Sequence, residues 1–166
     1  QNKWLKSFFF LGCLLLVIAT MTLLIPVIFN SNDNNWLTPI GLFFSILFFG
    51  LLIYTLFFAL PFQKTYCQNN KKPEICQTGV YALCRHPGVL WFIGFYFSLC
   101  LMAPDPALLL AACLYSICNI LYIIFQDKWT FPQQFSNYAD YQNKTPFLWP
   151  TGRSLRQCIC TLRKKV

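Results

Sequence analysis

Residues 89–125 read VLWFIGFYFSLCLMAPDPALLLAACLYSICNILYIIF, two apolar runs joined by a short proline-rich turn. The runs are Val89–Ala103 and Ala107–Phe125. A helix crosses the hydrocarbon core of a bilayer with about 20 apolar residues, and the second run meets that length. The first run is shorter, so we expect its helix to begin already at His86 to Gly88, because a proline suits a first helical turn. The two runs predict an antiparallel helical hairpin.

Two further apolar segments, Phe8–Phe29 and Trp36–Phe62, precede this hairpin. The chain is 57% hydrophobic and 11% charged, whereas about a quarter of a soluble domain is charged. The first segment exceeds the roughly 7–15 residues of a signal-peptide core and no A-x-A-like site follows, so we expect a retained helix. The sequence predicts an all-α fold over residues 1–166, a single integral membrane domain. It is a bundle of four transmembrane helices with a C-terminal interfacial helical segment.

The basic residues indicate how the bundle is oriented. All 13 Lys and Arg lie before the first segment, between the second and third, or after the fourth. With four spans these regions share one side, and the positive-inside rule puts both termini in the cytoplasm. The multi-pass protein would belong to a bacterial inner membrane or an endoplasmic reticulum. Topology accounts for the net charge of +8, so we expect no nucleic-acid partner.

The nine cysteines do not predict a metal site. Four of them lie inside apolar segments, where free cysteine packs as a small hydrophobe. The other five are cytoplasmic in this topology, where disulfides rarely persist. Cys158 and Cys160 lack a second pair at zinc spacing. Palmitoylation of Cys158 or Cys160, which lie in a basic tail near the membrane, stays open.

Polar side chains gather where the hairpin ends on the predicted cytoplasmic side. Arg85 carries a planar fork of donors suited to a carboxylate or phosphate, and the free N–H groups of the helix opened by Pro87 favour an anion. Asp127 follows the fourth helix, so the hairpin brings it beside Arg85 and His86. Ionisable groups at membrane helices are functional candidates, although an Arg85–Asp127 salt bridge explains both residues without a function.

The chain beyond Asp127 mixes aromatic and polar residues at helix-like spacings. We expect interfacial amphipathic structure, broken near Pro132, that folds over the cytoplasmic end of the bundle. Residues 151–166 form a basic tail favoured by anionic lipid heads. The fourth helix carries a small-residue face, which lets helices approach closely in lipid. Its members are Ala111, Ala112, Ser116 and, one turn on, Asn119. Asn119 either bonds a neighbouring helix or touches a ligand.

Two blocks of this sequence resemble a known enzyme family. The first contains Gly79, Tyr81, Arg85, His86 and Pro87 in the pattern G-x-Y-x-x-x-R-H-P. The second contains Asp127, Phe131, Phe135, Tyr138 and Tyr141, followed by Thr145-Pro146 and Pro150. Together they resemble the C-terminal half of the isoprenylcysteine carboxyl methyltransferase and phospholipid methyltransferase superfamily of small membrane enzymes. The resemblance covers residues 79–150, which we take as the cofactor-binding half.

The resemblance implies a methyltransferase that uses S-adenosylmethionine and acts on a lipid-like or apolar acceptor. The implied cofactor contacts are Tyr81, Arg85, His86, Pro87, Asp127, Tyr138 and Tyr141. Arg85 and His86 are the catalytic candidates, and His86 would position the acceptor, accept its proton or bind the cofactor. The candidates for acceptor binding are Val89, Leu90, Trp91 and Asn119. Methyl transfer is an in-line displacement in which positioning supplies much of the rate.

The chain also departs from the family pattern. The differing positions are Lys128 for an acid, Ser136 for Gly, Val89 for Tyr, Trp91 for Gly and Phe147 for Arg. These departures bear on acceptor specificity and catalytic competence. Two other functions stay open: a non-catalytic four-helix membrane protein that retains the fold, and a membrane reductase using NADPH. The sequence names neither the acceptor nor the oligomeric state.

Overall fold

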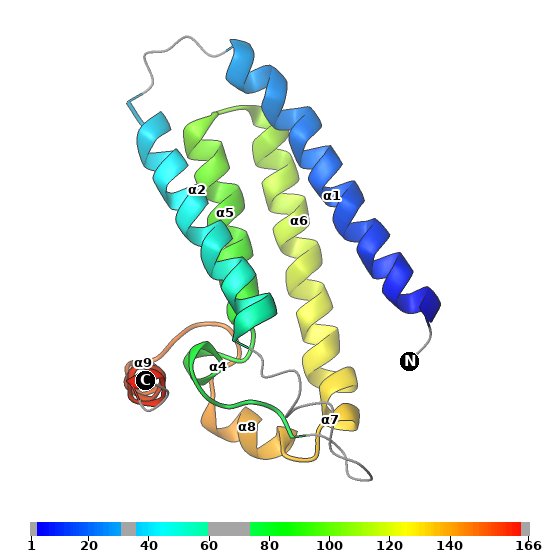
Figure 1. Cartoon of the computed structure of the whole chain (residues 1–166), viewed down its shortest axis with the longest axis vertical. Helices are drawn as coiled ribbons and strands as arrows, with labels where there is room; N and C mark the ends of the chain where they lie inside the picture. The colour runs from blue at the N-terminus through cyan, green and yellow to red at the C-terminus, as the bar shows by residue number, and fades with distance from the viewer. Residues whose placement is uncertain (1–2, 31–35, 60–73, 164–166) are drawn as a thin grey trace.

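The computed structural model describes residues 3–30, 36–59 and 74–163. Four long helices run along the molecule: α1 (Lys3–Asn30), α2 (Thr38–Ile53), α5 (Pro87–Met102) and α6 (Pro106–Phe125) (Figure 1). π-helical turns extend two of them, η1 (Tyr54–Phe58) after α2 and η2 (Gln126–Thr130) after α6, and α7 (Phe131–Gln134) follows η2. The short helices α4 (Val80–Leu83), α8 (Tyr138–Lys144) and α9 (Gly152–Arg163) gather at one end. The described residues contain no strand, which confirms the all-α prediction.

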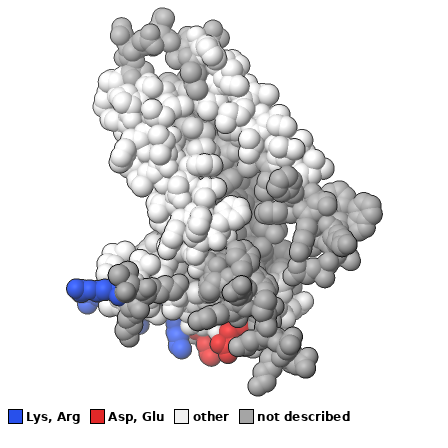
Figure 2. Space-filling model, in the orientation of Figure 1, with Lys and Arg blue, Asp and Glu red and all other residues white. Residues whose placement is uncertain are grey.

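Two of these helices are long and apolar enough to cross a membrane, Thr38–Phe58 and Pro106–Gln134. The apolar helices Leu14–Pro26 and Pro87–Met102 are shorter, so four spans remain a prediction. Large apolar side chains of the long helices are exposed, including Phe43 at 63% and Leu110 at 61%. An apolar surface of this extent is typical of a lipid-facing protein. Figure 2 shows the Lys, Arg, Asp and Glu of this face gathered at the end that carries the short helices.

Helices α5 and α6 form the predicted hairpin. Helix α5 begins at Pro87, as expected from the sequence, and ends at Met102. The carboxylate of Asp105 accepts the backbone N–H groups of Ala107 and Leu108 at 2.9 and 3.0 Å and so caps the start of α6. A buried apolar cluster then joins the two helices. It contains Tyr96, Leu99, Ala103, Leu108 and Ala112, together with Leu24 of α1.

Helices α2 and α5 lie side by side because glycine lets their backbones meet (Figure 1). A Cβ atom on Gly41 would lie 2.4 Å from the backbone nitrogen of Met102. A Cβ atom on Gly94 would lie 2.9 Å from the Phe48 ring. Small residues at such crossings are the usual means of close helix packing in lipid. Helix α1 is attached to α5 by a buried hydrogen bond between Thr20 and the Tyr96 hydroxyl, 2.8 Å long.

Some sequence-based boundaries differ from the structure. The last residues of the predicted segment Trp36–Phe62 lie outside the described residues. The helix after Asp127 continues through Pro132 and ends at Gln134, so the break predicted near Pro132 lies at Phe135, whose backbone is extended. Residues 152–163, predicted as a basic tail, form helix α9. On this helix Cys158 is buried and Cys160 is exposed, so only Cys160 is accessible to an acyl chain.

Candidate functional site

The link between α4 and α5 presents the Arg-His-Pro motif at the end of the bundle. Gly79 begins α4 with φ of +66°, a conformation that glycine adopts without strain, and Cys84 ends it in an extended conformation. The backbone N–H of Arg85 donates to the carbonyl of Pro146 at 2.9 Å. Pro87 opens α5 directly afterwards. The motif is therefore held between α4, α5 and the chain that follows α8.

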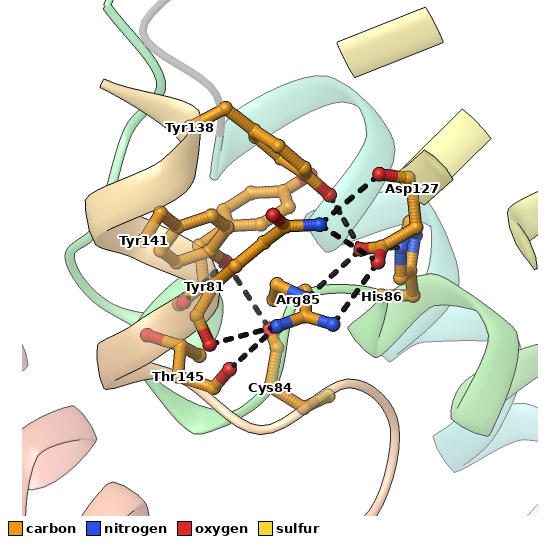
Figure 3. Close-up of polar contacts among 9 residues, drawn as sticks. Tyr81, Cys84, Arg85, His86, Asp127, Tyr138, Tyr141 and Thr145 are labelled. Atoms are coloured by element: carbon orange, nitrogen blue, oxygen red, sulfur yellow. Dashed lines mark hydrogen bonds and ion pairs between the residues drawn. The ribbon is translucent and has the colours of Figure 1, made fainter. Parts of the chain in front are cut away.

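The carboxylate of Asp127 is the centre of the site (Figure 3). It lies in η2 and is 6% exposed. Its Oδ1 accepts the Tyr138 hydroxyl at 2.5 Å and lies 3.3 Å from His86 Nε2. Its Oδ2 accepts from Arg85 Nη2 at 3.0 Å and from Gln142 Nε2 at 3.1 Å. We call Arg85, His86, Asp127, Tyr138 and Gln142 the carboxylate hub. Four side chains from two parts of the sequence, the Arg-His-Pro motif and α8, thus converge on one buried acid.

The Arg85 guanidinium connects the hub to the chain after α8. Its Nη1 donates to the carbonyls of Gln142 and Thr145 at 2.9 and 3.2 Å. The Phe147 ring lies under the guanidinium carbon, 5.5 Å from centroid to Cζ, a cation–π arrangement. Arg85 Nε lies 2.9 Å from Asp127 Oδ1, but its N–H is not aligned with an acceptor. Among the described residues this Nε is the one buried side-chain nitrogen or oxygen without a hydrogen bond.

His86 is held in an aromatic environment. Its ring stacks on Phe131 with centroids 5.9 Å apart and meets the edge of Phe147 at 5.2 Å. Burial lowers the pKa of the His86 imidazole, and the hydrogen bond to Asp127 opposes that shift only in part. The ring is therefore neutral at pH 7. Because an ionised carboxylate can only accept, Nε2 carries the proton that faces Asp127 and Nδ1 is left as the basic atom.

The three tyrosines predicted for the site form hydrogen bonds with different partners. Tyr138 donates to Asp127, and burial raises the pKa of its hydroxyl, so it acts as a neutral donor. Tyr141 is fully buried and donates to the Tyr81 carbonyl at 2.6 Å. The Tyr81 hydroxyl instead donates to the carbonyl of Thr55 in η1 at 3.1 Å. Tyr141 and Tyr81 thus join α8, α4 and the end of α2 beside the hub.

The four predicted acceptor residues do not share one surface. Val89 is buried in an apolar cluster with Ile123 and Leu148, and Leu90 packs against that cluster. Trp91 lies on another side of α5, donates to Thr55 Oγ1 at 3.0 Å and stacks on Phe48. Asn119 is half-buried on α6, and its side chain forms no hydrogen bond with any residue that the structure describes. The inward direction of Ala111, Ala112 and Ser116 agrees with the predicted small-residue face.

The structure adds residues that the sequence did not single out. Gln142 donates to both the backbone carbonyl and the carboxylate of Asp127, each at 3.1 Å. Gln142 could have been predicted from its position one helical turn after Tyr138, since residues four apart share a helix face. Phe147, noted only as a departure from the family pattern, contacts both Arg85 and His86. No local pattern indicated the carbonyl of Thr145 as a partner of Arg85.

The sequence from the start of α2 to just before α8 matches the model of a known family. The family model described as phospholipid methyltransferase matches residues 37–137, more than half of the chain. The chain belongs to the phospholipid methyltransferase family, and membership implies a membrane methyltransferase. The matched range runs from the start of α2 through Arg85, His86 and Asp127 and ends one residue before Tyr138. No curated protein and no solved structure matches the chain.

Proposed function

We propose that this protein transfers a methyl group from S-adenosylmethionine to a lipid-like or apolar acceptor at the carboxylate hub. The observation that carries the proposal is the buried imidazole of His86, whose Nε2 lies 3.3 Å from Asp127 Oδ1 beside the Arg85–Asp127 pair, at the end of an apolar bundle. Arg85, His86 and Asp127 all lie within the family match. The site would then receive a water-soluble cofactor from the polar end and an apolar acceptor from the lipid.

The donors and acceptors of the hub fit a zwitterionic cofactor in their chemistry. The buried Nε–H of Arg85 lies 2.9 Å from Asp127 Oδ1 without being aligned with it, so this donor would serve an anionic group of the cofactor once the pair opens. Asp127 is the acceptor that an ammonium or a ribose hydroxyl would require. Both side chains already bind each other and Gln142, so their first role is to hold the frame of the site. The rings of Phe131 and Phe147 provide aromatic faces beside it.

S-adenosylmethionine, when bound, supplies an electrophilic methyl group on a sulfonium. The protein residues then position the acceptor and manage its proton. His86 Nδ1 accepts the proton, while Asp127 holds the imidazole through Nε2 and stabilises the imidazolium that forms. The apolar cluster of Val89, Ile123 and Leu148 lies one turn into the bundle and excludes water from that side. A group positioned in this way typically contributes about 10²–10⁴-fold to a rate.

The distribution of charge supports the proposed topology of four spans with both termini in the cytoplasm. The exposed cations Lys128, Lys144 and Arg153 lie at the hub end, opposite the turn between α5 and α6. Helix α1 begins and α9 ends toward that same end (Figure 1). The positive-inside rule then makes the hub end cytoplasmic. A reporter fused after Val166 should be active only in the cytoplasm, and an exported reporter would exclude this topology.

Ligand-dependent stability tests the cofactor. S-adenosylhomocysteine at about a hundred times its dissociation constant should stabilise the protein by about 2.7 kcal/mol, whereas NADPH should not. The His86→Gln variant should still bind S-adenosylhomocysteine but transfer labelled methyl groups to membrane lipid about 10²–10⁴ times more slowly. The Asp140→Asn variant, altered at an exposed site on α8, is the control and should behave as wild type. Absence of stabilisation by S-adenosylhomocysteine would refute the proposal.

One observation favours a second candidate, a bundle that keeps the fold without catalysis. Asp127 already accepts from Tyr138, Arg85 and Gln142, and a structural clamp needs nothing more. In that case neither S-adenosylhomocysteine nor NADPH would change the melting temperature. Substitution of Asp127 would still destabilise the protein.

A further inference from the structure

Three stripes of residues run along helix α9, and each stripe begins one residue after the previous one. Ser154, Cys158 and Thr161 form the face toward α4. Cys158 packs with Ala82 and Leu83, and Thr161 Oγ1 accepts the Gly79 N–H at 3.0 Å. Consecutive residues of an α-helix are about 100° apart, so the next two stripes each turn by that angle.

The second face of α9 is apolar and uncovered. Leu155 is 51% exposed, Ile159 is 57% exposed and Leu162 is 37% exposed. These residues follow the spacing i, i+4 and i+7, which places them in one stripe along the helix. Trp149, just before the helix, is 76% exposed. Tryptophan is enriched where a protein crosses the boundary between lipid and water.

The third face is cationic. Arg156, Cys160 and Arg163 form it, and Arg153 lies on the same side; all four are exposed. Helix α9 contains no Asp or Glu, so its three arginines are not neutralised within the helix. A helix with an apolar stripe flanked by arginine is typical of one that lies in the interface of an anionic membrane.

The placement of α9 agrees with that partner. In Figure 1, α9 is seen end-on beside α4, while α2, α5 and α6 run along the picture. The helix therefore lies across the direction of the candidate spans, at the end of the bundle where the basic residues gather (Figure 2). An in-plane membrane helix must have this orientation.

We propose that α9 is an anchor for anionic lipid, with Leu155, Ile159 and Leu162 in the acyl boundary and Arg153, Arg156 and Arg163 at the head groups. The anchor affects the carboxylate hub, because the face of α9 formed by Ser154, Cys158 and Thr161 packs against α4. Helix α4 carries Tyr81, whose carbonyl accepts from Tyr141, and leads directly into Arg85. Anionic lipid would thus order the α4 side of the carboxylate hub. This inference concerns membrane binding and does not rest on methyl transfer.

Amide hydrogen exchange of the full chain in nanodiscs tests the anchor. Discs of phosphatidylcholine alone are compared with discs containing phosphatidylserine, at one protein copy per disc. Each arginine near an anionic surface favours binding by about five-fold, so three give on the order of a hundred-fold. Exchange of α9 amides should slow by up to this factor in the anionic discs, and α4 amides should follow. Salt at about 1 M should abolish the difference, since it shortens the screening length to about 3 Å.

Charge-neutralising variants distinguish the effect of the α9 arginines on lipid binding from the effect of basic residues elsewhere. Arg153→Gln, Arg156→Gln and Arg163→Gln together should remove the lipid dependence, whereas Lys144→Gln on α8 should retain it. Unchanged protection of the α6 amides shows that the triple variant is folded; if it is lost, the salt titration of the wild type decides. Equal exchange in neutral and anionic discs would overturn the proposal. Protection that appears only with two copies per disc would also overturn it, in favour of a second copy of this chain.

Discussion

Replacing Asp127 by Asn should unfold the protein at a much lower temperature. Asparagine has nearly the same shape but removes the charge, and it turns an amide nitrogen toward donors. The Arg85 side chain, only 11% exposed, would keep its charge without a counterion. Removal of one partner of a buried ion pair costs about 3–5 kcal/mol. For a chain of this size each kcal/mol shifts the melting temperature by about 2–4 °C, so the expected loss is about 6–20 °C.

The measurement is thermal unfolding of the purified protein in one detergent or nanodisc, followed by circular dichroism. Asp140→Asn is the matched control because it makes the same chemical change at an exposed position of α8. Exposed substitutions usually alter stability by less than about 0.5 kcal/mol. A loss for Asp127→Asn no larger than that of Asp140→Asn would show that the hub does not hold the fold together.

A double-mutant cycle then identifies the partner. Arg85→Gln alone should also destabilise, since it leaves the buried carboxylate without its cation. The double variant should lose less than the sum of the two single losses, by about 0.5–3 kcal/mol, because contacting residues are coupled. Additive losses would mean that Asp127 is stabilised by Tyr138 and Gln142 rather than by Arg85.

Three further perturbations test other parts of the structure. The His86 pKa is lowered in the folded state from about 6.5, so the unfolded chain binds the proton more tightly. The stability that is present above pH 6.5 should therefore fall as the pH drops below 6.5. Melting temperatures measured between pH 8 and 5 should show this fall, and the His86→Gln variant should show a flatter profile. Gly41→Ala should lower the melting temperature, because a Cβ on this residue would lie 2.4 Å from the Met102 backbone nitrogen and would push α2 away from α5. Gly50→Ala on the same helix should not lower it, because Gly50 has open space around it. Trp91→Ala should lower the melting temperature through the cavity it leaves beside Phe48 and Thr55, by less than the about 3–5 kcal/mol that a fully buried Trp would lose, because Trp91 is partly exposed. A change in acceptor range without a loss of stability would instead favour the predicted acceptor site at Trp91.

The sequence alone predicted the helical class and several helix ends. Apolar length indicates a helix in lipid, and Pro87 marked the start of α5 because a proline fits a first turn. The turn between α5 and α6 was readable from Asp105 and its flanking prolines. These features depend on residues close together in the chain. The hairpin then brought Asp127 to Arg85 and His86, a contact that the structure confirms.

Only the tertiary structure decided which side chains complete the hub and which way their neighbours face. Gln142 and Phe147 reach Arg85, Asp127 or His86 because the chain after α8 turns back over the end of the bundle. Val89 and Trp91 point about 200° apart, as residues two apart on any α-helix do, but the packing of α5 on α2 decides that Trp91 faces Phe48 and Val89 faces Ile123. The basic tail is a docked helix because α4 supplies the surface on which it packs. Such contacts join residues far apart in sequence, so no local pattern records them.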